Sequence, residues 1–184
     1  MAPYYLTGLG LKLRAHPLAV ALALQQLEIL PDVLAAKRMF ASLYTQAFGS
    51  IPFLNSPDVS PSASPSWYAY NLRFDAEAAG CSREEFVEAL QAEGLVEVDI
   101  PNSTRPLHRE PLFTNPAGAL PRLYDTAARP QSDPDDYPNA DRFFSEVIKL
   151  PVAAFADERF IMEAYIEGIV KVSEHLVERG SLLR

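Results

Sequence analysis

The strongest constraint on this sequence is a run of apolar residues near its N-terminus. Within Leu18–Leu30 the only polar side chains are those of Gln25, Gln26 and Glu28. A helix formed by these residues is apolar on nearly all sides, which is typical of a helix buried between packed layers. Pro17 suits the first turn of such a helix, because its missing N–H needs no partner there. We therefore expect a helix that protein covers on most of its surface.

A second helix is expected directly after the first. Pro31 and Asp32 interrupt the apolar run, and apolar residues then recur at helical spacing over Val33–Phe48. Gly49 follows as a stop. Together the two segments predict a long helical arm that is kinked or broken at the proline.

Two other interpretations of the apolar run are a secretory signal and a membrane span. Lys12 and Arg14 precede Leu18–Leu24 as the charged region of a signal would. His16 and Pro17 interrupt that approach, however, and no clear small-residue cleavage site follows. Seven apolar residues are also too few to span a bilayer. We therefore expect a cytoplasmic protein.

The composition excludes several classes of function. The 184 residues carry a formal net charge of −8, so a nucleic-acid surface or an anionic membrane surface would lack the clustered cations it needs. A single cysteine, Cys81, forms no internal disulfide, and three scattered histidines suggest no metal site. Because 48% of the residues are hydrophobic, one domain of this length can build a full core.

The middle of the chain predicts a linker, a strand and a capped helix. The linker is the stretch Asn55–Ser66, which is rich in proline and serine. Trp67–Phe74 alternates in strand fashion, with Tyr70 and Phe74 on one of its two faces. A capping box pairs Ser82 with the glutamate three residues later, and the helix that it starts is expected to stop at Gly94.

The remaining elements complete an α+β fold. In order they are a strand at Leu95–Ile100, a long loop over Pro101–Pro138, a helix at Asn139–Glu146 and a strand at Val147–Val152. Asp157 is expected to cap a last helix that ends at Gly180. This order predicts a helical arm followed by a small antiparallel sheet covered by helices.

Four blocks of the sequence carry a family resemblance. They are GLGLKLRAHPLAVALALQQL (Gly8–Leu27), SWYAYNLRFD (Ser66–Asp75), SREEFVEALQAEGL with PLHREP (Ser82–Leu95 and Pro106–Pro111) and YPNADRFFSEVIKLP (Tyr137–Pro151). In this order they resemble the C-terminal part of the DegT/DnrJ/EryC1/StrS sugar aminotransferases, fold type I enzymes that use pyridoxal phosphate (PLP). The resemblance implies that residues 67–184 are the small domain, 55–66 a linker, and 1–54 an arm that links to or packs on a large domain.

The resemblance also implies that the catalytic lysine is missing. In a complete family member the lysine that binds PLP covalently lies well before the first block, and only seven residues precede that block here. Lys12, Lys37, Lys149 and Lys171 are expected to be ordinary lysines, because none falls in the context of a PLP-binding lysine. The chain is therefore expected to share PLP with a partner chain that carries the lysine, as a hetero-oligomer.

Lys12 and Arg14 are the candidate cofactor-binding residues. They precede a helix start, where backbone N–H groups and nearby cations favour an anion. In the family this stretch reaches across the dimer to the phosphate of PLP in the neighbouring subunit. Lys12 stands where the family has an asparagine, and a lysine can serve a phosphate as a point charge. The alternative is a pair of solvated cations.

His108 and Arg105 are the candidate substrate-binding residues. They lie with Arg109 in a proline-flanked loop, RPLHREP, which is stiff and polar enough to hold a carboxylate, a phosphate or a sugar hydroxyl. In the family the matching histidine lies near the substrate, and that role carries over to His108, with the two arginines as weaker neighbours. The alternative is a surface loop in which His108 bonds only to backbone.

Three hypotheses about function remain open at this point. The leading one is the small-domain subunit of a split aminotransferase, which moves an amino group from a small-molecule donor to a keto sugar, a cyclitol or a related precursor of a secondary metabolite such as an antibiotic. A dehydratase subunit of the same family would have the same sequence features. The second is a non-catalytic regulatory or interaction protein derived from an aminotransferase. The third is a fragment of a longer protein.

Overall fold

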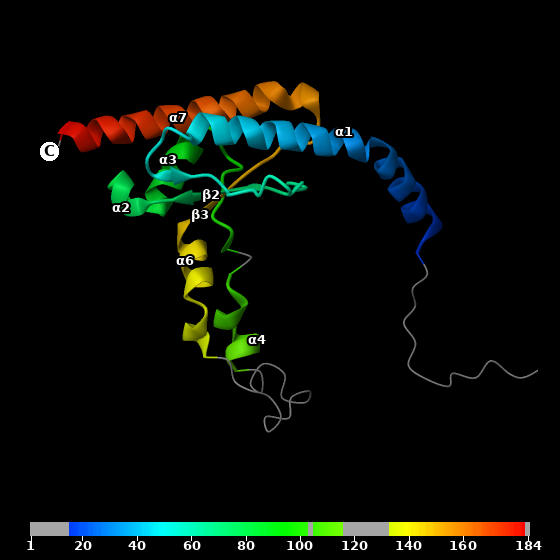
Figure 1. The fold of residues 1–184 in the computed structure, drawn as a ribbon, viewed down its shortest axis with the longest axis horizontal. Helices are drawn as coiled ribbons and strands as arrows, with labels where there is room; N and C mark the ends of the chain where they lie inside the picture. The colour runs from blue at the N-terminus through cyan, green and yellow to red at the C-terminus, as the bar shows by residue number, and fades with distance from the viewer. Residues whose placement is uncertain (1–14, 103–104, 116–132, 183–184) are drawn as a thin grey trace, which may run out of the picture.

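The structure, a computed structural model, describes residues 15–102, 105–115 and 133–182. Two long helices, α1 (Pro17–Phe48) and α7 (Arg159–Leu182), run side by side in the same direction over a small sheet (Figure 1). The helix α3 (Arg83–Ala92) packs beside α7. The shorter helices and turns are α2 (Ala76–Ala79), η2 (Leu107–Arg109), α4 (Pro111–Thr114), η3 (Pro134–Asp136), α6 (Pro138–Glu146) and η4 (Ala156–Glu158).

The sheet has three antiparallel strands in the order β1-β2-β3, which confirms the predicted α+β class. They are β1 (Leu54–Asn55), β2 (Tyr70–Phe74) and β3 (Val147–Leu150). The alternation predicted for the central strand holds over β2, where Tyr70, Leu72 and Phe74 are buried while Asn71 is exposed and Arg73 is half-buried. The strand begins at Tyr70 rather than at Trp67, and the short strand β1 was not predicted.

The hydrophobic core lies between the sheet and helices α1, α3 and α7. Helix α1 contributes Phe40, Tyr44 and Phe48, each fully buried, at the four-residue spacing that keeps side chains on one helix face. The Tyr44 hydroxyl donates to the carbonyl of Pro151 at 3.1 Å, which ties α1 to the segment after β3. Burial raises the pKa of Tyr44 well above its ordinary value, so this hydroxyl keeps its proton and remains a donor.

Helix α1 is continuous through Pro31, so the long arm that was expected to be kinked or broken at the proline is not broken there. Proline removes one backbone hydrogen bond and crowds the preceding turn, and a helix can accommodate both by bending. The ribbon does bend in the N-terminal part of α1 (Figure 1). The C-terminal part of the helix stays straight because the core holds it on one side.

The N-terminal part of α1 is uncovered within this chain. Every residue of Leu18–Leu30 is exposed, although the composition of this run favours burial between layers. By length and composition alone α1 would suffice to cross a membrane, but a helix that packs against protein passes the same test. The cytoplasmic location expected from the sequence therefore stays a prediction.

Local capping signals predicted α3 correctly. The Ser82 hydroxyl accepts from the Glu85 backbone N–H at 3.2 Å, and a Glu85 carboxylate oxygen accepts from the Ser82 N–H at 2.8 Å. Gly94 follows the helix with a φ of 101°, a left-handed conformation that favours glycine. Beyond it, the strand predicted over Leu95–Ile100 is wrong, because only Asp99 pairs with β3, as an isolated bridge to Lys149.

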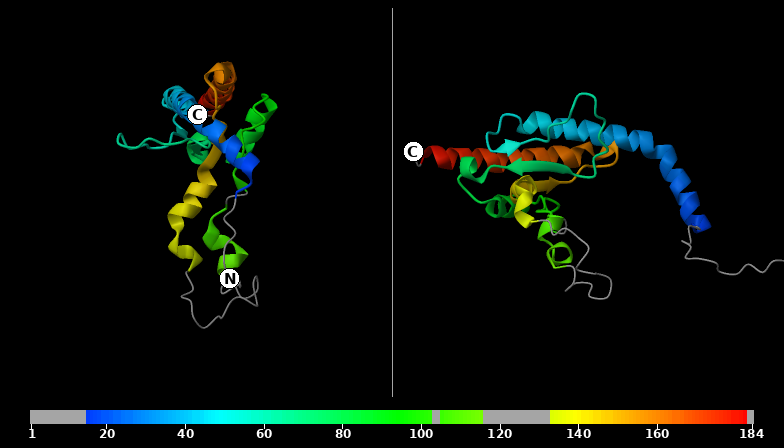
Figure 2. Two further views of the ribbon diagram at one scale, coloured as in Figure 1. Left: turned by 90° about the vertical axis from the view of Figure 1, so that its right-hand side faces the viewer. Right: turned by 60° about the horizontal axis from the view of Figure 1, so that its bottom comes forward.

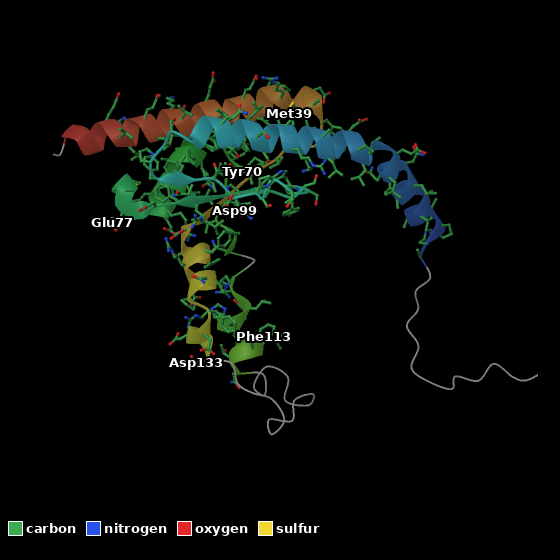
Figure 3. The ribbon with its side chains drawn as sticks, viewed as in Figure 1. Met39, Tyr70, Glu77, Asp99, Phe113 and Asp133 are labelled. Atoms are coloured by element: carbon green, nitrogen blue, oxygen red, sulfur yellow. The ribbon has the colours of Figure 1, made fainter. Side chains whose placement is uncertain are left out.

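The segments on either side of residues 116–132 form a projection from the body, which we call the leg (residues 105–115 and 133–146). Helix α6 lies beside η2 and α4 along the leg, as Figure 1 and the left view of Figure 2 show. Phe113 and Asp133 lie toward its far end (Figure 3). The long loop expected over Pro101–Pro138 therefore contains short helical turns where it is described.

The start and end of α7 differ from expectation. Asp157 lies in the turn η4 rather than capping the helix, and the Glu158 carboxylate instead accepts from the backbone N–H groups of Ala154 and Phe155 at 3.0 and 2.9 Å. The helix also runs past Gly180 to Leu182. The short helix α2 was not predicted either; the Asp75 side chain caps it by accepting from the Ala78 N–H at 3.0 Å.

Candidate functional site

Of the four predicted site residues, the structure describes His108 and Arg105, while Lys12 and Arg14 lie outside the described residues. His108 belongs to the turn η2, and Arg105 directly precedes that turn. Pro106 starts the turn, and the backbone N–H of Arg109 closes it on the Pro106 carbonyl at 2.9 Å. The leg therefore carries the predicted substrate-binding residues at a distance from the helices that form the core (Figure 1).

His108 is held by two residues of the opposite side of the leg. Its Nε2 lies 2.9 Å from Oδ1 of Asp141 on α6, and its ring stacks on the ring of Tyr137 with centroids 4.9 Å apart. The His108 side chain is only 10% exposed. A carboxylate at Nε2 favours a proton on that nitrogen, which leaves Nδ1 as the acceptor of a neutral ring.

Arg109 joins the same cluster through a two-point ion pair. Its Nε and Nη2 lie 3.2 and 2.6 Å from the two carboxylate oxygens of Asp141, and Nη2 also lies 3.1 Å from Asp135. Two parallel N–H donors match a carboxylate in geometry as well as charge. The Arg109 guanidinium, with a smaller contribution from His108, holds the pKa of the Asp141 carboxyl below its usual range. Asp141 is thus anionic and fixes the position of His108.

Arg105 makes a separate pair. Its guanidinium Nε lies 3.0 Å from a carboxylate oxygen of Glu110, and the arginine side chain is 58% exposed. The structure therefore brings His108 and Arg109 into one cluster and leaves Arg105 paired beside it. Asp141 and Tyr137, which sequence reasoning missed, complete the cluster from α6 and from the residue before it.

The pKa of Asp141 gives a prediction that NMR can test. A carboxyl whose pKa is lowered in the folded protein stabilises it above the ordinary carboxyl pKa, about 3.9, and this contribution disappears as the pH falls through the lowered value. Asp141 is expected to titrate at a lower pH than exposed aspartates of the same chain, and Arg109→Gln is expected to move its midpoint upward. A ¹³C titration of the side-chain carboxyls measures both. An Asp141 midpoint that is ordinary and unmoved by the variant would contradict the cluster.

The described lysines are all engaged. Lys37 donates through Nζ to the carbonyl of Val152 at 2.9 Å, Lys149 pairs with Asp99 at 3.0 Å, and Lys171 pairs with Glu93. A lysine that attacks a carbonyl must be held as a free amine, by burial or by a cationic neighbour, whereas Lys149 and Lys171 lie beside carboxylates. Each of the three lysines that the structure describes therefore has a partner within the chain.

Comparison with known proteins places this chain in a family. The model of the DegT/DnrJ/EryC1/StrS aminotransferase family matches residues 1–161, which is most of the chain. The chain belongs to this family. The DegT-family chain is 29% identical over 149 residues to the spore coat polysaccharide biosynthesis protein SpsC of Bacillus subtilis (strain 168), an alignment that covers 81% of this chain and 34% of SpsC.

Solved structures agree on the fold of this DegT-family chain. DesV of S. venezuelae, determined in complex with a ketimine intermediate, superposes with a TM-score of 0.62 at 21% identity over 84% of this chain and 35% of DesV. A sugar aminotransferase of Streptococcus pneumoniae in its apo form gives a TM-score of 0.61 at 22% identity, over 88% of this chain and 36% of that one. The chain therefore spans about a third of the length of the relatives that it matches.

Asp141 and Tyr137 lie within the last of the four blocks that carry the family resemblance, at Tyr137–Pro151. A signal for Asp141 was therefore present in the sequence of this DegT-family member. The pairing with His108 was not, because the two residues are 33 positions apart and only the fold of the leg brings them together.

Proposed function

We propose that this chain acts as the small-domain subunit of a PLP-dependent sugar aminotransferase whose cofactor lysine is carried by a partner chain. The observation that carries the proposal is the uncovered apolar run Leu18–Leu30 in a member of this family. Large exposed apolar surfaces mark interaction sites, and this helix has the composition of one covered by protein. The engaged lysines support the proposal, because each described lysine already has a partner.

Each part of the chain has a role in this proposal. Residues 1–54 form the arm that docks on a large domain, residues 55–66 connect it, and residues 67–184 form the small domain that covers the substrate. Lys12 and Arg14 would contact the phosphate of the shared PLP. The amino-transfer chemistry itself belongs to the cofactor, and the protein supplies binding and orientation.

His108 and Arg105 would contact the substrate from the leg. The geometry that supports this role is the Asp141 carboxylate at Nε2, since it leaves Nδ1 of His108 as the nitrogen that can accept from a hydroxyl or ammonium group. Arg105 can exchange part of its exposed pair with Glu110 for a substrate anion, because exposed ion pairs are weak. The acceptor we propose is a keto sugar, a cyclitol or a related precursor.

Two alternatives stand beside this proposal. The fold is shared with the GDP-4-keto-6-deoxy-D-mannose-3-dehydratase of E. coli, at a TM-score of 0.54 and 19% identity, so a dehydratase subunit would look the same. A non-catalytic regulatory protein would use the same uncovered helix to bind a complete aminotransferase.

One co-purification experiment tests the proposal. The chain is purified alone and together with a chain that carries the N-terminal aminotransferase half, and the visible absorbance of lysine-bound PLP is recorded. We expect no such absorbance from the chain alone, and both the absorbance and amino transfer from the pair. In the pair, Lys12→Ala is expected to weaken PLP retention without unfolding.

The outcomes separate the hypotheses. Lysine-bound PLP in the chain alone would contradict the assignment of its lysines. A stable pair with neither bound PLP nor amino transfer would favour the regulatory alternative, and unchanged PLP retention in Lys12→Ala would remove the phosphate contact of Lys12.

A further inference from the structure

A pocket of about 460 Å³ lies where β2, α6 and the segment after β1 meet. Six of the residues that line it carry polar side chains, and Pro57 and Phe143 add apolar surface; the polar six are Ser56, Asp58, Asn71, Arg73, Asn139 and Arg142. The volume falls within the range of small-molecule sites. None of these residues belongs to the His108 cluster or to the proposed contacts with PLP.

The local structure of β2 and α6 builds this pocket. Asn71 and Arg73 are two residues apart on β2, so both side chains lie on the sheet face opposite the buried Tyr70 and Leu72. On α6, Asn139, Arg142 and Phe143 are spaced by three and four residues, which places them on one helix face. A strand and a helix therefore present their polar faces to the same space on regular, rigid backbone.

Glu146 holds the two guanidinium groups in place. One carboxylate oxygen lies 2.8 Å from Nε of Arg142, and the other lies 3.4 Å from Nη1 of Arg73. Each arginine keeps further N–H donors, because a guanidinium has five and Glu146 engages few of them. Glu146 thus orients both guanidinium groups and leaves several of their N–H donors available to a ligand.

One polar group of the lining is buried without a partner among the residues that the structure describes. The Ser56 Oγ makes no hydrogen bond, which is costly for a hydroxyl unless a ligand or water satisfies it. The side chains of Asn71, Asn139 and Asp58 line the same pocket and are exposed. Hydrogen-bond donors and acceptors of these side chains therefore line the same pocket.

The charges of the pocket nearly cancel. Arg73 and Arg142 are balanced by Asp58 and Glu146. A phosphate or another strong anion would meet the two carboxylates as well as the two arginines, which disfavours it. A neutral ligand with many hydroxyls fits better, because each hydroxyl can both donate and accept a hydrogen bond. It can donate to a carboxylate, accept from a guanidinium group, and do either with an amide.

Phe143 supplies the apolar part of the recognition. Its ring is 44% exposed beside these polar groups. A pyranose ring has hydroxyls around its edge and C–H groups on its faces, so its face can cover an aromatic ring while its edge bonds to polar groups. We propose that this pocket binds a saccharide, with the sugar face on Phe143 and its hydroxyls on Asn71, Asn139 and the two arginines.

This saccharide site goes beyond the proposed transfer of an amino group, since it needs neither PLP nor a partner chain. The saccharide proposal can therefore be correct if the split-enzyme proposal is wrong, and it can be wrong if the split-enzyme proposal is correct. A binding measurement on the full chain, without any enzymatic assay, keeps the two separate.

Saturation-transfer difference NMR on the full chain tests the site. The probes are methyl β-D-glucopyranoside, N-acetylglucosamine and maltose, and inorganic phosphate is the competitor. We expect transfer to the protons of at least one sugar face, with phosphate at equal concentration failing to compete. Phe143→Ala is expected to weaken binding about tenfold, because a stacked ring pair contributes roughly the free energy of one decade in affinity.

Phe160→Ala is the matched control, since Phe160 is an exposed phenylalanine on α7 outside the pocket, and it is expected to leave binding unchanged. Asn139→Ala is expected to weaken binding as well, through lost hydrogen bonds at an exposed position. The proposal is overturned if none of the three sugars binds, if phosphate displaces the bound sugar, or if Phe143→Ala and Phe160→Ala bind alike.

Discussion

Replacing Leu24 and Leu27 together by aspartate is expected to abolish binding of this chain to the proposed large-domain partner while leaving its own fold intact. The two side chains are 57% and 61% exposed within the chain, three residues apart on one face of α1. Burying a leucine in an interface contributes about 1.5–3 kcal/mol, and two charges at a dry contact add a desolvation cost. The expected loss in affinity is at least on the order of a thousandfold.

Gel filtration of the purified pair, together with thermal unfolding of the chain alone, measures both halves of this prediction. Gln25→Asp is the matched control, because it adds a charge to the same helix on the stripe that already holds Glu28 and Asp32. The control is expected to assemble normally. Full assembly of the double variant would show that this face of α1 is not the docking surface.

Phe40→Ala is expected to destabilise the chain by about 3–5 kcal/mol, the usual cost of deleting a buried phenylalanine. Phe40 is fully buried in the core cluster, at the part of α1 that faces the sheet. Because domains of this size have unfolding free energies of about 5–15 kcal/mol, such a loss leaves little stability. Urea unfolding measures the change.

Gln46→Ala on the same helix provides the comparison for Phe40→Ala. Gln46 is exposed, and surface substitutions of this kind change stability by about 0.5 kcal/mol or less. A loss below about 1 kcal/mol for Phe40→Ala would mean that α1 does not pack on the sheet as the structure has it.

The elements that sequence reasoning predicted well are those specified by neighbouring residues. The capping box at Ser82 and Glu85, the left-handed Gly94 and the alternation over β2 each depend on residues a few positions apart. The family resemblance extended this local information to the whole α+β architecture. These predictions needed no knowledge of which segments meet.

The predictions that failed depended on contacts between distant segments. The strand expected after Gly94 has β-type composition but pairs with β3 only at Asp99, since Leu95 and Val98 are buried at a spacing of three rather than two. The strand β1, only two residues long, exists because Leu54 and Asn55 find partners on β2.

The candidate site divides in the same way. The substrate-binding role of His108 and Arg105 came from their own loop and the family resemblance and stays a prediction, whereas Asp141 and Tyr137 were recognised only once the leg placed α6 against η2. The saccharide pocket was not predicted at all, because its lining comes from three segments that are separated in the sequence.

By itself the sequence therefore determined the family, the fold class, the capped and alternating elements and the apolar character of residues 18–30. Only the tertiary structure decided that this apolar run stays uncovered, that the described lysines are engaged, and that His108 bonds to Asp141. Local patterns constrain backbone conformation and the polarity of a face. Which face meets which is decided by packing between residues far apart in the chain, and no window of sequence contains that information.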